Sequence, residues 1–239
     1  MVAAMMRKTL AKIAPLAAAI AAMQTPMAHA GSLSVLPVRV EVAADQQFCS
    51  LTIGNDGNQD VMVQVRGFRW YQDADGTDAL DETKRIAVNP SIVTIPAGTK
   101  KLVRCSLPGQ TDTLESTYRL IVNELPRHHA QSGTLQTLLQ LSIPVFRAPP
   151  GHSSALQWST TSDGGVIVSN TGTRHARVAR LELRGDAGEP VAVPGSFYLL
   201  AGASRVVTTD MPLNRMTSVK AIAEDGYAMP VRFERGPMP

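Results

Sequence analysis

The chain has 239 residues, of which 44% are hydrophobic and 18% are charged, and its formal net charge is +3. This length accommodates two domains of about 100 residues each once an N-terminal leader is removed. Without the leader's Arg7, Lys8 and Lys12, the 23 Lys and Arg fall to 20, equal to the 20 Asp and Glu. With a neutral mature chain, nothing favours a nucleic-acid partner, which would require a basic face.

Residues 1–30 have the pattern of a signal peptide. A basic start precedes the apolar run Ile13–Ala22, and Ala28-His29-Ala30 places small residues at the two positions that a signal peptidase reads. The apolar run is too short to span a bilayer, so no stable membrane insertion is expected. We predict cleavage after Ala30 and export.

The mature chain reads as all-β. Short runs rich in Val, Ile, Leu, Thr and Tyr recur between Gly, Pro, Asn and Asp turn signals. In residues 31–148 we expect strands near 33–42, 48–54, 61–70, 91–95, 100–107, 117–124 and 134–146. This number of strands in about 110 residues is typical of an immunoglobulin-like sandwich.

Pro149-Pro150-Gly151 marks the expected domain boundary, because proline fixes φ and removes a hydrogen-bond donor. Residues 149–239 are predicted to form a second β-sandwich. Its strands are expected near 155–160, 165–170, 176–184, 196–200, 205–209, 218–223 and 229–234.

Cys49 and Cys105 both lie in β-type runs of the first domain. In an exported protein an even number of cysteines favours a disulfide, here one that joins two strands. Free thiols are the alternative. A redox pair would show C-x-x-C spacing, which the chain lacks.

Residues 134–146 alternate apolar and polar side chains over an unusual length. Leu135, Thr137, Leu139, Leu141 and Ile143 share one face, and Val145 continues it. Such a strand can complete the sheet of another protein. The alternative is that these side chains face the domain's own core, and alternation alone does not separate the two.

No constellation for catalysis or metal binding is found. His128-His129 are adjacent, so on a strand they would point to opposite faces, and no Cys, Asp or Glu cluster accompanies them. The acidic stretch 73–82 reads as a hairpin loop, because its glycine comes too early for a calcium-binding EF-hand. Phosphate-binding and hydrolase motifs are missing. We therefore expect no enzyme activity, no cofactor and no metal.

The chain resembles the periplasmic pilus-assembly chaperones of chaperone–usher systems, the PapD-like family. The matching pieces, in order, are LPVRVEV, LTIGNDGNQDVMVQVRGFRW, VNPSIVTIPAGTKKLVR and YRLIVNELP, followed by the alternating strand and its proline stop. Tyr118-Arg119 and the Phe-Arg-Ala-Pro ending look closer to the archaic branch. The resemblance implies two sandwiches in a boomerang. It also implies that the periplasmic chaperone binds pilus subunits and delivers them to an outer-membrane usher.

By this resemblance, the last strand of the first domain acts as a donor strand. Leu135, Thr137, Leu139 and Leu141 would fill the groove of a subunit that lacks its own final strand. Hiding the unpaired edge and groove would prevent aggregation. An exposed apolar edge recruits partners, which makes self-association of the free protein reasonable as well.

The resemblance also implies charged sites. The family's anchoring arginine falls on Arg39, where a guanidinium could bind the subunit's C-terminal carboxylate. The family's partner lysine aligns with Pro144, which carries no charge. Arg119, a charge within an apolar strand, is the candidate substitute. Arg39 as an ordinary exposed strand arginine is the alternative.

Glu124, Arg147 and Asp225 match positions of an interdomain charge network in the family. Each alone could instead be a solvated surface charge. Two other functions are the alternatives. A secreted immunoglobulin-like pilus subunit or adhesin would usually have one sandwich and a flexible N-terminal extension. A secreted β-sandwich hydrolase would require a nucleophile with its base or paired carboxylates, which cannot be assigned.

Overall fold

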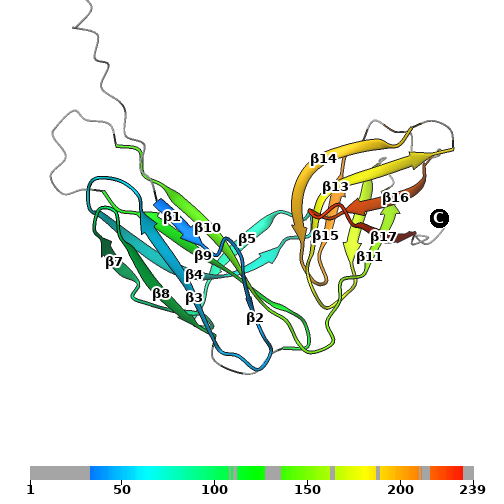
Figure 1. The fold of residues 1–239 in the computed structure, drawn as a ribbon. Helices are drawn as coiled ribbons and strands as arrows, with labels where there is room; N and C mark the ends of the chain where they lie inside the picture. The colour runs from blue at the N-terminus through cyan, green and yellow to red at the C-terminus, as the bar shows by residue number, and fades with distance from the viewer. Residues whose placement is uncertain are drawn as a thin grey trace, which may run out of the picture. The chain divides into compact units, whose positions relative to one another are not determined.

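The structure is a computed structural model that describes residues 33–107, 109, 112–126, 136–161, 165–186, 189–209, 211 and 216–233. These residues form strands, turns and bends, with no helix among them. Accordingly, this part of the chain contains no helix that could cross a membrane. The predicted leader lies outside the described residues. The fold class predicted from the sequence, all-β, is confirmed (Figure 1).

Strands β1 to β10 build the first sandwich from two sheets. The first sheet has the order β1-β3-β8-β6, with β1 at Leu33–Leu36, β3 at Phe48–Asn55, β8 at Lys100–Ser106 and β6 at Ala87–Asn89. The second has the order β2-β10-β9-β4-β5, with β2 at Val40–Val42, β10 at Gln140–Arg147, β9 at Ser116–Glu124, β4 at Val61–Gln72 and β5 at Asp78–Glu82. Strand β7 (Ile92–Ile95) pairs with β4 as well.

The chain passes between the two sheets at two prolines. The single strand predicted at 33–42 is in fact two strands, β1 in one sheet and β2 in the other, separated at Pro37. Pro90 separates β6 from β7 in the same way. Because proline lacks an N–H, it cannot continue a ladder of hydrogen bonds, which makes these positions suitable for a change of sheet.

The core between the two sheets is made by the inward-facing half of each alternating strand. Leu51 and Ile53 on β3 pack with Leu120 and Val122 on β9 and with Val145 on β10, all nearly inaccessible to solvent. Cys49 and Cys105 lie opposite each other in the register of β3 and β8, with their Cα atoms 4.9 Å apart. Their sulfur atoms are at bonding distance in the structure.

Strand β4 continues past its predicted end and forms a hairpin with β5. The acidic stretch predicted as a hairpin loop is therefore partly turn and partly strand. The turn is closed by hydrogen bonds from the backbone N–H of Gly76 to the carbonyl of Asp73 and from the N–H of Thr77 to the Asp75 carboxylate. The latter bond lowers the pKa of Asp75.

Strands β11 to β17 form one continuous ladder around a second core. Its order is β14-β13-β16-β17-β11-β12-β15, with β14 at Val191–Leu199, β13 at Ala176–Gly185, β16 at Met216–Ile222, β17 at Ala228–Phe233, β11 at Leu156–Thr160, β12 at Val166–Asn170 and β15 at Ser204–Val207. Strand β17 pairs with β16 up to Pro230 and with β11 from Val231 onward, so the ladder turns over the core at this proline.

Both sandwiches contain the same buried asparagine turn, of sequence Asn-x-Gly. The amide nitrogen of Asn55 donates to the carbonyls of Gln59 (2.7 Å) and Ile95 (2.9 Å), and its oxygen accepts the N–H of Gly57. Asn170 binds Arg174, Leu199 and Gly172 in the same pattern. Gly172 must be glycine, because a Cβ there would collide with the backbone of Ser153. The turn therefore fixes the backbone that leads to Arg174.

Candidate functional site

The predicted donor strand enters its own sandwich gradually. Leu135 lies outside the described residues, Thr137 is exposed, and Leu139 and Leu141 are half-buried. Leu141 already packs against the core of the first sandwich, and Ile143 is fully part of it. The C-terminal part of the alternating face therefore packs into the core of the first sandwich, whereas its N-terminal part lies outside that core.

Strand β10 has one covered edge and one half-covered edge. It pairs with β9 along its whole length, from Gln140 opposite Asn123 to Arg147 opposite Ser116. On its other edge β2 pairs in parallel with residues 145–147 only. Within the described part of the chain, residues 140–144 therefore have no partner strand on that edge.

The backbone groups of this open edge can be assigned from the register. The N–H of Glu124 donates to the carbonyl of Leu139 at 2.8 Å, which makes this a hydrogen-bonded pair of the antiparallel ladder. Because such pairs alternate, Gln140, Ser142 and Pro144 direct their backbone groups away from β9. Gln140 and Ser142 offer both N–H and C=O to the open edge, whereas Pro144 offers only C=O.

Arg119 is held in an aromatic environment. It lies on β9 between Pro144 of β10 and Phe68 of β4, and its side chain is only 16% exposed. Its guanidinium carbon lies 3.7 Å from the centroid of the Trp70 ring, and one of its nitrogens is 3.6 Å from the Asp78 carboxylate. The cation–π contact and the carboxylate compensate the burial of this charge.

Burial lowers the pKa of the Arg119 guanidinium, and the carboxylate of Asp78 opposes this effect. The Asp78 carboxylate is half exposed, and its distance from the Arg119 guanidinium exceeds the ordinary length of a hydrogen bond. An additional carboxylate near Arg119 would therefore be electrostatically favoured.

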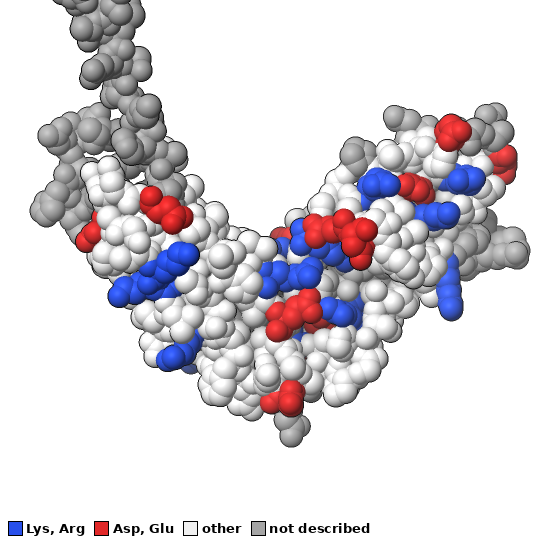
Figure 2. Space-filling view, in the orientation of Figure 1, with Lys and Arg blue, Asp and Glu red and all other residues white. Residues whose placement is uncertain are grey.

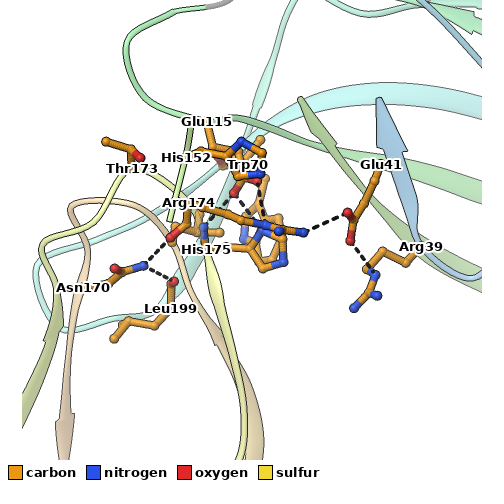
Figure 3. Close-up of polar contacts among 12 residues, drawn as sticks. Arg39, Glu41, Trp70, Glu115, His152, Asn170, Thr173, Arg174, His175 and Leu199 are labelled. Carbon is orange, nitrogen blue, oxygen red and sulfur yellow. Dashed lines mark hydrogen bonds and ion pairs between the residues drawn. The ribbon is translucent and has the colours of Figure 1, made fainter. Parts of the chain in front are cut away.

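Arg39 lies in the bend between β1 and β2. Its side chain is about as exposed as that of Glu41, with which it forms an ion pair. Its Nε is 3.2 Å from Oε1 of Glu41 on β2. The other oxygen of Glu41 is 2.8 Å from the guanidinium of Arg174, which belongs to the second sandwich (Figure 3). Arg39 and Arg119 do not share a partner in these contacts.

The three residues predicted to form an interdomain charge network bind other groups. The Glu124 carboxylate accepts the backbone N–H of Leu139, and Asp225 accepts that of Tyr227 in its own turn. Arg147 is 5% exposed and donates to backbone carbonyls, those of Leu107, Gly109 and Ala44. Among the described residues, no ion pair joins Glu124, Arg147 and Asp225.

A different polar pair connects the sandwiches. The buried carboxylate of Glu115 accepts the backbone N–H of His175 at 2.8 Å and lies 2.7 Å from Nδ1 of the same residue. Phe146 of β10 stacks on the His175 ring, with their centroids 3.7 Å apart. The sequence offered no particular signal for this pair, because a single Glu and a single His in loop-like positions match no motif.

Aromatic side chains surround this polar pair. Trp70 and Phe146 are almost fully buried and pack with Leu200 of the second sandwich. Tyr198 adds an edge-on contact to Trp70, with centroids 5.3 Å apart. Gln72 completes the contact by binding the carbonyl of Tyr198 and the N–H of Leu200.

A hollow of about 620 Å³ lies beside these contacts. Its charged lining comprises Arg39, Glu41, Arg174, Arg177, Glu224 and Asp225. Near the middle of the face that Figure 2 shows, acidic and basic side chains stand next to one another. His128 and His129 lie outside the described residues. Within the part of the chain that the structure describes, no group of three or more His, Cys, Asp or Glu is placed to hold a metal ion.

Residues 32–153 match the family model described as pili and flagellar-assembly chaperone, PapD N-terminal domain. This is half of the chain, and the protein belongs to this family. The predicted resemblance is therefore confirmed. No curated protein sequence matches the chain.

Solved structures of pilus chaperones share the fold. A chain of the CsuC–CsuE chaperone–tip adhesion subunit pre-assembly complex, from archaic Csu pili of Acinetobacter baumannii, is 22% identical with a TM-score of 0.71, and the match covers 85% of this chain and 100% of that one. The CupB2 chaperone of Pseudomonas aeruginosa is 19% identical with a TM-score of 0.57, and the match covers 82% of this chain and 97% of that one. A chain of the complex of the SafA pilin with the SafB chaperone of Salmonella enterica is 18% identical with a TM-score of 0.59, and the match covers 84% of this chain and 94% of that one. These similarities confirm the two immunoglobulin-like domains.

Proposed function

We propose that this protein is a periplasmic chaperone that binds pilus subunits by donor-strand complementation and delivers them to an outer-membrane usher. The observation that carries the proposal is the open edge of β10 at residues 140–144, next to a half-buried apolar face at Leu139 and Leu141. Strand addition at such an edge requires no catalytic residue and no cofactor. The protein acts by binding alone.

The charge at the end of the open edge sets the direction of the added strand. Strand β2 occupies the edge from Val145 onward and is preceded by Arg39. A subunit strand laid along residues 140–144 ends beside Arg39, and a cation there favours a carboxyl end over an amino end. The added strand therefore runs parallel to β10, as β2 does.

Arg39 and Arg119 are the proposed cations for the subunit's terminal carboxylate. Arg39 is the more accessible, whereas Arg119 is the more desolvated and gains more from a further anion. Replacing each by alanine in a strain that co-expresses the subunit tests them separately, with complex yield as the measurement. If neither Arg39→Ala nor Arg119→Ala reduces the yield of the complex, the proposal that these arginines bind the subunit's terminal carboxylate is wrong.

The chaperone function is tested by co-purification from the periplasm. Tagged mature protein should recover a small sandwich protein in a 1:1 complex from its own host. Leu139→Asp should abolish the complex, because it places a charge in the apolar groove of the subunit. Leu102→Asp is the matched control, since Leu102 is an exposed leucine on β8 in the other sheet. Equal recovery by both variants would contradict donor-strand binding.

Two further features belong to this function. Export to the periplasm by the predicted leader places Cys49 and Cys105 in an oxidising compartment, where the disulfide forms. Alkylation of the purified protein before and after reduction, followed by mass spectrometry, distinguishes a bridge from free thiols. Self-association of the free protein through the open edge of β10 should disappear when a subunit is bound, which light scattering would detect.

A further inference from the structure

One carboxylate bridges two arginines from different sandwiches. Glu41 contacts Arg39 at 3.2 Å with one oxygen and Arg174 at 2.8 Å with the other (Figure 3). A free carboxylate bound between two guanidinium groups would use its oxygens in the same way. The side chain of Glu41 thus occupies a two-cation carboxylate site with the protein's own carboxylate.

Arg174 is held firmly enough to serve as part of a site. Its carbonyl accepts the buried amide of Asn170 at 2.7 Å, and its N–H donates to the carbonyl of Ser153 at 3.2 Å. Its side chain remains 35% exposed. On its inner side the Nε lies 4.0 Å from the buried Glu115 carboxylate, which keeps the guanidinium close to the interface.

Other charges lining the hollow are already engaged. Arg177 forms an ion pair with Glu224, and the Asp225 carboxylate accepts the N–H of Tyr227. Glu41 is 45% exposed, and exposed ion pairs are weak, so an incoming carboxylate displaces it at little expense. Glu41 also lies opposite Phe146 in the register of β2 and β10, at the place where the open edge ends.

We propose that Arg174 is a further cation of the subunit-carboxylate site, beside Arg39, and that Glu41 is an internal carboxylate which the subunit's C-terminus displaces from Arg39 and Arg174. The assignment rests on the proposed function. It gives Arg39 of the first sandwich a partner cation from the second sandwich, in addition to Arg119, the candidate substitute for the lysine at the position of Pro144. In the free protein, the bridge keeps both guanidinium groups neutralised and oriented toward the site until a terminal carboxylate arrives.

The test uses an N-acetylated tetra-alanine peptide with a free C-terminal carboxylate, and the same peptide with a C-terminal amide. Binding is followed by NMR through the Nε–H signals of Arg39 and Arg174. The carboxylate peptide should shift both signals and the amide peptide neither. Glu41→Gln should tighten carboxylate binding by about two- to fivefold, and Arg174→Ala should weaken it by a similar factor.

Arg180 and Glu182 provide matched controls, since they form an exposed ion pair on β13 away from the hollow. Arg180→Ala and Glu182→Gln should leave peptide binding unchanged. Equal binding by Glu41→Gln and the native protein, or equal binding of the two peptides, would overturn the inference. A native protein that binds the carboxylate peptide but captures no subunit would overturn the proposed function and leave the carboxylate exchange standing.

Discussion

At the scale of single residues, two buried asparagines hold the turns of the two sandwiches. Asn55 and Asn170 are each 1% exposed, and each amide nitrogen donates to two carbonyls. The amide oxygen of Asn55 accepts one N–H, that of Gly57, and the oxygen of Asn170 accepts two, those of Ala155 and Gly172. Replacing Asn55 by alanine leaves these groups buried without partners, so we expect a loss of about 3 kcal/mol in the free energy of unfolding. Urea denaturation measures it.

The exposed neighbour Asn58 provides the control for this prediction. Asn58→Ala should change the free energy of unfolding by less than about 0.5 kcal/mol. The role assigned to the turn would be wrong if the two variants were equally stable. Asn170→Ala should in addition loosen Arg174, whose carbonyl it binds, and so reduce carboxylate binding in the NMR titration.

Residue types alone predicted only part of the site. The sequence around Asn55 and Gly57 gave a turn, because Asn and Gly have intrinsic turn preferences, but not the burial of the amide, which depends on Ile95 from a distant strand. Arg119 could be singled out because a charge in an apolar strand needs compensation. The bridge from Arg39 through Glu41 to Arg174 could not be foreseen, because it joins residues 133 positions apart.

At the scale of elements, the open edge of β10 makes a prediction about its backbone. The N–H of Ser142 faces the open edge rather than β9, so Ser142→Pro removes a donor from an added strand and none from the pair with β9. The missing hydrogen bond should weaken the binding free energy of the subunit by about 1.5 kcal/mol. We therefore expect subunit capture to fall at least tenfold. Ser142→Ala should capture normally.

The contrasting variant is Ile143→Pro, which removes a donor that does face β9 and lies within the core. It should lower the thermal stability of the protein strongly, whereas Ser142→Pro should leave it nearly unchanged. Normal capture by a folded Ser142→Pro variant would show that the subunit does not use this edge. Circular dichroism on heating reports the stability of each variant.

Strands were predicted well where alternation was strong and poorly where it was not. Strand β9 alternates over a long stretch and was located nearly to its ends. Strands β5 and β6 were missed because DALDE and AVN are too polar or too short to show a period. The division of 33–42 was missed because alternation continues across Pro37, although the strand changes sheet there.

At the scale of the whole molecule, each sandwich has its own core, and a third cluster joins them. Leu200 belongs to the second sandwich, whereas Trp70 and Phe146 belong to the first. The buried carboxylate of Glu115 and its partner His175 lie against the same Phe146 ring. Because Phe146 is also on β10, the strand that offers the open edge is fixed from both sandwiches.

This shared cluster predicts that the two sandwiches unfold together. Tyr198 contacts Trp70, Phe146 and His175, so Tyr198→Ala should remove about 2 kcal/mol of coupling and split a single calorimetric transition into two. Tyr227→Ala is the matched control, because Tyr227 is 66% exposed in the second sandwich, and it should retain one transition. If both variants melt like the native protein, the cluster does not couple the sandwiches. If Tyr198→Ala melts in two steps, its capture of the subunit should also weaken, because the subunit strand would then meet a β10 fixed from one side only.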